Sequence, residues 1–195
     1  MGFLRDAALL LLAALVIVAI GKYFITQQQQ AILAAQAPVV EAVACGILKD
    51  TNVTSNAPEW NASQRALVLD TAPLQDVIIE EPVEWTIRND ATKQDCTIRD
   101  IKVNYAMELV AGSGDPTKKV KLSISAANVM NFNEDTNTII KLPAGASETV
   151  KVRVTYKGNQ WTSGDSVMVT LTATAGSGAK SGSNTVTDYF YVKVA

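Results

Sequence analysis

The hydrophobic pattern divides the chain into two parts. Residues 3–20 (FLRDAALLLLAALVIVAI) are almost continuously apolar, with Arg5 and Asp6 as the only charges. From residue 65 onward, apolar and polar residues alternate in short runs that turn residues separate. A continuous apolar run of this length predicts a long helix, and short alternating runs predict half-buried strands. The pattern therefore predicts an α+β protein, in which a long N-terminal hydrophobic α-helix precedes an all-β antiparallel sandwich.

The apolar run continues into an amphipathic stretch. Five aliphatic residues recur at spacings of seven and four, as on one face of a helix, while glutamine and glutamate residues occupy the opposite face. Pro38 lacks a backbone donor and is expected to kink the helix near Ala34. We therefore expect a helix over residues 1–48, a turn-rich linker over 49–64 and a β-sandwich head over 65–195. The aliphatic residues are Ile25, Ile32, Val39, Val43 and Ile47.

Three roles compete for the apolar segment. A cleavable leader needs a basic start and a cleavage site close behind the apolar run. Here Asp6 neutralises Arg5, and the nearest Ala-x-Ala site, at 35–37, lies about 15 residues further on. A membrane anchor and a filament core built from neighbouring helices fit better, and the pattern leaves both open. The residues expected to pack in a filament core are Ala7, Ala8, Leu11, Ala14, Leu15, Val18 and Ala19.

Over residues 1–50 the chain resembles the type IV pilin superfamily, and more loosely its archaeal pilin and archaellin branch. The shared pattern is a short polar start, an apolar run and an amphipathic continuation that leads into a β-rich head. The bacterial family places a glutamate five residues into the mature chain, whereas this sequence has Arg5 followed by Asp6. The resemblance implies an extracellular filament of identical subunits that are inserted in a membrane before assembly. Adhesion to surfaces or to other cells is its expected role.

The head is predicted to contain eight or nine short strands. The clearest run is Thr97–Val110, in which Ile101, Val103, Tyr105, Met107 and Leu109 are expected to face the core and the residues between them to face water. Glycine, proline and asparagine separate the runs, as turns require. The predicted strands are 65–70, 76–80, 83–88, 97–110, 119–125, 149–156, 166–175 and 185–195.

Residues 139–152 (IIKLPAGASETVKV) resemble the strand–turn–strand stretch of CARDB-like and other immunoglobulin-like domains. This resemblance implies an immunoglobulin-like sandwich and says nothing about activity. A surface protein that carries such a domain as a binding module on a single membrane anchor is therefore the alternative to a filament subunit.

Two sequence features bear on the compartment. Cys45 and Cys96 lie 51 positions apart and could be two buried thiols, but the exported character of the rest favours a disulfide. Two N-glycosylation sequons, Asn52-Val53-Thr54 and Asn61-Ala62-Ser63, make Asn52 and Asn61 candidate acceptors. Sequons also arise by chance in a chain rich in threonine, serine and asparagine.

The composition offers little chemistry. The chain has no histidine and a formal net charge of −2, so neither a common general base nor a basic nucleic-acid surface is expected. We expect no enzyme, no cofactor and no nucleic-acid partner. One weak metal candidate has alternating oxygen side chains like the first half of a calcium loop, but Leu142 stands where that loop needs glutamate. A polar loop between strands is the simpler interpretation of Asn131, Asn133, Asp135 and Asn137.

Overall fold

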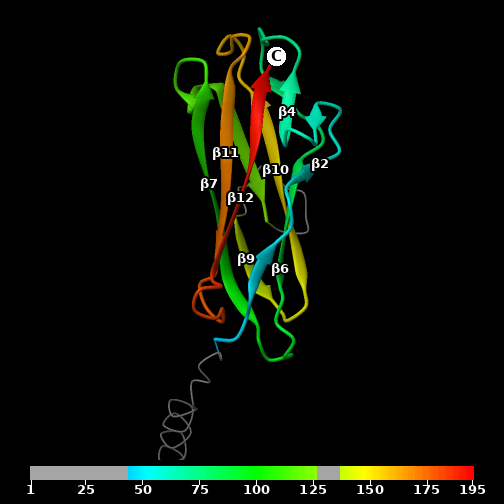
Figure 1. The fold of residues 1–195 in the computed structure, drawn as a ribbon, viewed down its shortest axis with the longest axis vertical. Coiled ribbons are helices and arrows are strands. Elements are labelled where there is room, and N and C mark those ends of the chain that lie inside the picture. The colour runs from blue at the N-terminus through cyan, green and yellow to red at the C-terminus, as the bar shows by residue number, and fades with distance from the viewer. Residues whose placement is uncertain (1–43, 127–136) are drawn as a thin grey trace, which may run out of the picture. The chain divides into compact units, whose positions relative to one another are not determined.

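Two β-sheets face each other in the part of the chain that the computed structural model describes, residues 44–126 and 137–195 (Figure 1). These residues belong to a unit that runs from Ala42 to Ala195. The first sheet has the order β1-β6-β10-β5, with β2 also on β6 and β8 also on β10, and the second has the order β3-β4-β12-β11-β7-β9. Among the described strands, all pairings are antiparallel except that of β12 with β4.

The strands are mostly those expected from the alternating pattern, since each of the eight predicted runs contains one. A single helical turn, α2, joins the two sheets between β7 and β8. The first sheet consists of β1 (Leu48–Asp50), β2 (Thr54–Ser55), β5 (Val77–Ile78), β6 (Val83–Asn89), β8 (Val120–Ser125) and β10 (Ser147–Tyr156). The second consists of β3 (Trp60–Asn61), β4 (Ala66–Leu69), β7 (Ile98–Ala111), β9 (Thr138–Leu142), β11 (Ser166–Thr174) and β12 (Thr185–Val194), and α2 spans Pro116–Lys119.

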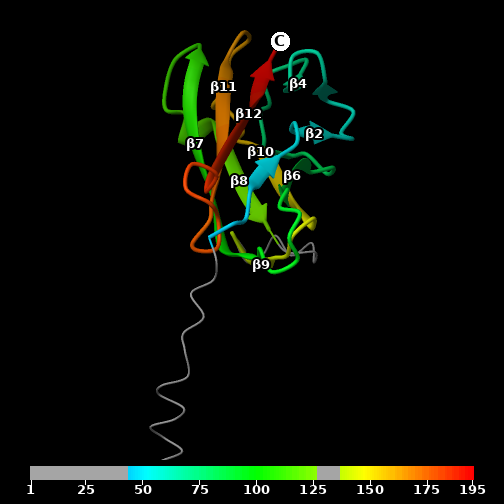
Figure 2. The ribbon, with the colours of Figure 1, turned by 60° about the horizontal axis from the view of Figure 1, so that its bottom comes forward.

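The core lies between the sheets and follows the period of two. Alternate residues of β10 and β11 are at most 1% exposed, and those between them are only half-buried. Both views of the molecule place β7, β11 and β12 side by side in one layer (Figures 1 and 2). The buried residues of β10 and β11 are Val150, Val152, Val154, Tyr156, Val167, Val169, Leu171 and Ala173.

The predicted α+β class is wrong, because the described residues form an all-β domain whose helical content is the short α2. The greater part of the predicted helix, residues 1–43, lies outside the described residues. The last part, 44–48, is described and is not helical: Gly46 forms an isolated bridge to Ala179, and Leu48 begins β1. Within the described ranges, no helix has the length and apolar character needed to cross a membrane.

Backbone pairing explains why residues 44–48 are extended. The Gly46 N–H donates to Gly178 O at 2.8 Å, and Gly46 O accepts from Lys180 N at 2.7 Å. The approach is so close that a Cβ on Gly46 would lie 2.4 Å from Ile98 Cγ1. Ile47, which the spacing of aliphatic residues assigned to a helix face, therefore lies in extended backbone directly before β1.

The segment expected to be a linker, 49–64, is part of the sandwich. It contains β2 and β3, which pair with β6 and β4. Val53 and Ala57 are buried at 3% and 5% exposure. The folded domain therefore begins well before residue 65.

The longest strand, β7, matches its predicted alternation only in its first half. Ile101 and Val103 are buried, but Tyr105 is 44% exposed and Met107 and Leu109 are half-buried. The reason is that β9 pairs with β7 only as far as Lys102. Beyond that position no other described strand extends the sheet.

A buried tyrosine joins the two sheets. Tyr156, on β10, donates its hydroxyl hydrogen to Leu67 O at 2.8 Å and lies 3.3 Å from Lys193 O, and both carbonyls belong to the opposite sheet. The ring is fully buried, and this burial raises the pKa of the phenol well above its ordinary value. The hydroxyl therefore stays protonated and acts as a fixed donor.

We expect Tyr156→Phe to lower the free energy of unfolding by about 1–2 kcal/mol, because it leaves buried carbonyls without their donor. Urea unfolding followed by tryptophan fluorescence measures this loss. Tyr189→Phe, at a tyrosine that is 40% exposed, serves as the control and should change little. Equal stability of the two variants would contradict the bridging role.

Candidate functional site

The predicted cysteine pair is bonded, and a buried asparagine lies beside it. The structure joins Cys45 Sγ to Cys96 Sγ. Asn89, at the end of β6, is fully buried and donates from Nδ2 to Cys96 O at 2.6 Å and to Leu142 O at 3.1 Å. Its Oδ1 accepts from Ile47 N at 3.1 Å and from Ala91 N at 3.2 Å. The amide thereby uses both hydrogens and both lone pairs.

The disulfide excludes a metal centre at this point of the fold. Cys45, Asp95 and Cys96 are the one group of three potential ligands that lies close together in the described part of the chain. Both sulfurs are in the disulfide, so neither is a thiolate. The group is a covalent junction between the segment before β1 and the segment before β7.

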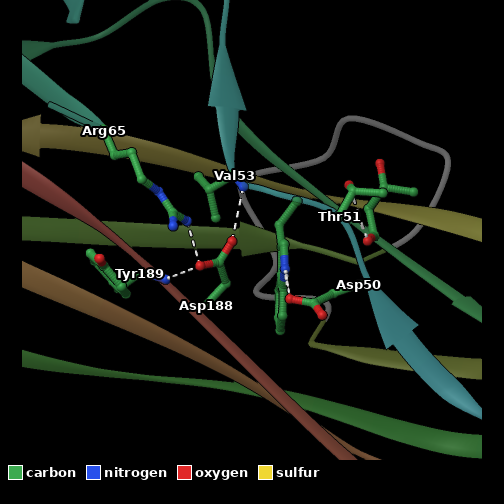
Figure 3. Close-up of polar contacts among 8 residues, drawn as sticks. Asp50, Thr51, Val53, Arg65, Asp188 and Tyr189 are labelled. Atoms are coloured by element: carbon green, nitrogen blue, oxygen red, sulfur yellow. Dashed lines mark hydrogen bonds and ion pairs between the residues drawn. The ribbon is translucent and has the colours of Figure 1, made fainter. Parts of the chain in front are cut away.

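A second polar cluster holds the N-terminal strands against β12 (Figure 3). Asp188 lies on the buried side of β12, where Oδ2 accepts from Val53 N at 3.0 Å and Oδ1 accepts from Tyr189 N at 2.9 Å. Oδ1 also forms an ion pair with Arg65, whose guanidinium lies 4.5 Å from the centroid of the Tyr189 ring. Close by, Trp85 Nε1 donates to Asp50 Oδ2 at 3.1 Å. The carboxylate is engaged by three donors, which fits a structural role.

A third cluster is a buried ion pair at the start of β11, which Asp165 directly precedes. Lys119 Nζ lies 2.5 Å from Asp165 Oδ2, and the two side chains are 5% and 0% exposed. Nζ also donates to Gln160 O at 2.5 Å and lies 5.5 Å from the Trp161 ring centroid. Gly112 closes the cluster with φ +96°, and a Cβ there would lie 1.7 Å from Asp165 Oδ1, so only glycine fits.

The pKa of Asp165 reflects two opposing effects. Burial raises the pKa of this carboxyl, but the hydrogen bonds from Lys119 and Thr162 outweigh it and hold the pKa below its ordinary value. Because the folded pKa lies below the unfolded one, the pair stabilises the fold above the ordinary carboxyl pKa of about 3.9. That contribution is lost as the pH falls through the folded pKa.

Both sequons lie at the surface. Asn52 is exposed between β1 and β2, and Asn61 is exposed at the end of β3. Asn61 Oδ1 accepts from Ser63 Oγ at 2.8 Å and from Gln64 N at 3.2 Å. These two hydrogen bonds hold the sequon in a local turn. Each acceptor is accessible, and occupancy of each stays a prediction.

The weak metal candidate is only partly described. Asn131, Asn133 and Asp135 lie outside the described residues, as do the predicted core-packing residues between Ala7 and Ala19. Asn137 is described, exposed, and accepts from Thr138 Oγ1 at 3.3 Å. Beside it lies a shallow cavity of about 150 Å³, and none of its described lining residues, Val103, Asn104, Tyr105, Ile124 and Asn137 itself, is acidic.

Sequence reasoning missed Asn89 and Asp188, although a signal for each exists. Asn89 continues the alternating inward series Val83, Trp85 and Ile87, all of which are fully buried. Asp188 likewise stands in the inward series of β12, two residues before the buried Phe190. A polar residue at an inward position of an apolar strand must find buried hydrogen-bond partners. The alternating pattern predicts that the residue is buried but does not identify those partners.

Comparisons with known proteins give similarity of fold at most. No protein-family model matches the chain, and no curated protein matches its sequence. Similar solved structures include a family 123 glycoside hydrolase from Clostridium perfringens, at 6% identity and a TM-score of 0.44, with 76% of this chain and 27% of that chain covered. The N-terminal domain of PorA has 17% identity and a TM-score of 0.39 over 66% and 85% of the two chains. The Salmonella SafD adhesin has 12% identity and a TM-score of 0.39 over 76% and 99%.

At these identities and TM-scores, none of the three similarities extends to a function. The chain spans about a quarter of the hydrolase. The class that fold and contacts define is therefore an all-β sandwich domain, closed by a disulfide, whose buried polar groups serve internal contacts.

Removal of the disulfide is expected to lower the free energy of unfolding by about 2–5 kcal/mol, because the unfolded chain gains freedom. The double variant Cys45→Ala/Cys96→Ala tests this by urea unfolding and leaves no free thiol. Asp95→Ala, at the exposed neighbour of Cys96, is the control. A double variant as stable as the control would show that the covalent junction is dispensable.

Asp165→Asn should lower the free energy of unfolding by about 3–5 kcal/mol at neutral pH, because Lys119 is left buried without its counter-charge. The difference from the unaltered protein should shrink as the pH falls, since acid protonates Asp165 in the unaltered protein. Thermal unfolding between neutral and acidic pH measures both effects. The control is Asp76→Asn, at the exposed ion pair with Lys157, which should lose little stability at any pH. A loss for Asp165→Asn that does not change with pH would contradict the ion-pair argument.

Proposed function

We propose that the protein is the structural subunit of an extracellular type IV pilus-like filament. The apolar N-terminal segment of residues 3–20 is buried among copies of itself in the filament core. The β-sandwich domains coat the outside, where they contact surfaces or other cells. The observation that carries the proposal is that one chain contains both a continuous apolar segment and a domain with its own hydrophobic core. Exposure of such an apolar segment to water is unfavourable.

The disulfide supports an extracellular place for the domain, because such bonds persist in oxidising compartments. The exposed sequons are consistent with the same location. The apolar segment is long enough to reside in a bilayer before assembly. Assembly then exchanges its lipid contacts for contacts with other subunits.

The second candidate function is a surface protein held by a single membrane anchor, with the immunoglobulin-like sandwich as its binding module. The length of the apolar run favours it, since about 20 residues suffice to cross a bilayer core. The two candidates differ in the lasting environment of residues 3–20, which is protein in a filament and lipid in an anchor.

We propose no catalytic role for either candidate. The chain has no histidine. In the described ranges, Oδ2 of Asp165 and both carboxylate oxygens of Asp188 accept from internal donors. The function therefore rests on assembly and contact rather than on a reaction.

Electron microscopy of cell surfaces, combined with analysis of sheared material, tests the proposal directly. Fibres that contain this chain as their major component are the expected result. Recovery of the chain only as a monomer from detergent-solubilised membranes would instead favour the anchored module.

Ala14→Asp is expected to abolish fibre assembly. A carboxylate in the apolar segment would be buried without water or a partner, at a cost of about 2.5–3.5 kcal/mol or more. The β domain, residues 42–195, should unfold at an unchanged temperature.

Gln28→Glu is the matched control, because it adds the same charge in the glutamine-rich stretch that follows the apolar run. Its fibre yield should stay near normal. Normal assembly of Ala14→Asp would remove residues 3–20 from the filament core and favour the anchor.

A further inference from the structure

The outer edge of β7 is open over its second half. On one side β7 pairs with β11 from Lys102 to Ala111, and on the other side β9 reaches only Lys102. The Val103 N–H then donates to Asn137 O at 2.7 Å. Among the described residues, nothing pairs with this edge beyond Val103. Both views place β7 at the margin of its sheet next to β11 (Figures 1 and 2).

The backbone of this edge is ready for another strand. Backbone groups alternate in direction along an antiparallel strand. Since the Val103 N–H points toward the open side, the N–H and C=O groups of Tyr105, Met107 and Leu109 point there too. Regular pairing with β11 continues to Leu109, and the register shifts past Val110 before it resumes at Ala111. The open edge therefore presents three residues centred on Met107.

The side chains of this edge lack the usual protection against pairing. Natural edge strands are blunted by lysine, proline or inward charges, whereas residues 103–110 (VNYAMELV) contain Glu108 as their sole charge. On the core side of the sheet, Tyr105 is 44% exposed and Met107 and Leu109 are half-buried. A shallow cavity of about 150 Å³ lies beside Tyr105. An added strand would cover this apolar margin.

We propose that the β7 edge pairs antiparallel with the β7 edge of a second copy of this chain, about a two-fold axis at Met107. Residues whose backbone groups point to the open side must face one another, and three registers pair at least two of Tyr105, Met107 and Leu109 in this way. One centres on Glu108 and sets two carboxylates side by side, which is unfavourable. One centres on Ala106 and sets Leu109 opposite Val103, whose N–H is already engaged by Asn137, so Leu109 would stay without a pair.

The register centred on Met107 avoids both conflicts. It sets Tyr105 opposite Leu109 of the second copy and Met107 opposite Met107, so that apolar side chains meet on the core side. On the outer side, Glu108 faces the small Ala106. The same surface of each copy forms the contact, as in an isologous dimer. The six-stranded sheet that contains β7 in one copy then continues into the same sheet of the other copy.

An antiparallel pair suits subunits that approach from opposite directions. If the proposed function holds, the pairing joins domains on neighbouring filaments or on facing cells, which makes the contact homophilic. The pairing itself depends only on the β domain, so it can be tested without fibres. Residues 42–195 form a unit with its own hydrophobic core and disulfide, and this unit is the material for the test.

Cysteine cross-linking tests the register. Directly opposed residues of a hydrogen-bonded antiparallel pair have Cα atoms about 5.5 Å apart, within the range of a disulfide. Met107→Cys should therefore give a covalent dimer on mild oxidation, since the native cysteines are already paired. Asn104→Cys, exposed on the same strand, is the control, because its own copy would lie about 20 Å away in this register.

Charge variants test the same register in equilibrium sedimentation. Ala106→Lys places a cation opposite Glu108 twice per dimer and should tighten association about two- to ten-fold. Ala106→Glu places a like charge there and should weaken it by a similar factor. Thr172→Glu, on β11, which is paired on both sides, should leave association unchanged, and thermal unfolding verifies that each variant is folded.

A domain that stays monomeric, or a Met107→Cys variant that cross-links no better than Asn104→Cys, overturns the pairing. A dimer that is indifferent to the sign of the charge at position 106 overturns it as well. Fibres that assemble normally from a chain with a monomeric domain would refute the pairing and leave the filament proposal intact. A specific domain dimer without fibres would do the reverse.

Discussion

The apolar layer between the two sheets is the constraint on which the rest of the domain depends. Trp85, Leu171 and Phe190 are fully buried in it and have no surface exposed to solvent. A polar group in such a layer must find partners within the protein. Asn89 and Asp188 each find theirs on several elements at once. These bonds decide which segments meet, whereas the apolar side chains alone would tolerate other arrangements.

The strands of the sandwich were predictable because one wet face and one buried face impose a period of two. The short strands β1, β2 and β3 were not, since two or three residues are too few to show a period, and the equally short β5 was predicted only as part of the apolar run 76–80. The helix predicted through Ile47 failed for a related reason. Its spacings of seven and four describe where aliphatic residues fall, but the pairing of Gly46 with the Gly178 region decides the backbone, and nothing near Gly46 in sequence reveals that partner.

The polar contacts divide along the same line. The cysteine pair could be predicted, because an exported chain with two cysteines offers a single pairing. The Lys119–Asp165 pair joins residues 46 positions apart, and Val53 meets Asp188 across 135 positions, so only the folded topology shows them. The open edge of β7 was also hidden. Its alternating sequence is that of a buried strand. The edge is open because β9 stops at the level of Lys102, and the sequence around Tyr105, Met107 and Leu109 gives no sign of this.

The position of the disulfide has a mechanical consequence for both proposed functions. A domain attached through the segment before Cys45 receives tension there, and β1 offers only three paired positions on β6 to resist it. The few hydrogen bonds of such a short ladder would break one after another under tension. The bond from Cys45 to Cys96 passes the tension to the residue group just before β7, whose ladder with β11 has nine paired positions. Asn89 fixes the same junction from within the core. The covalent link therefore places a ladder of nine positions, rather than one of three, in the path of the load, which suits a subunit or an anchored module that is exposed to tension.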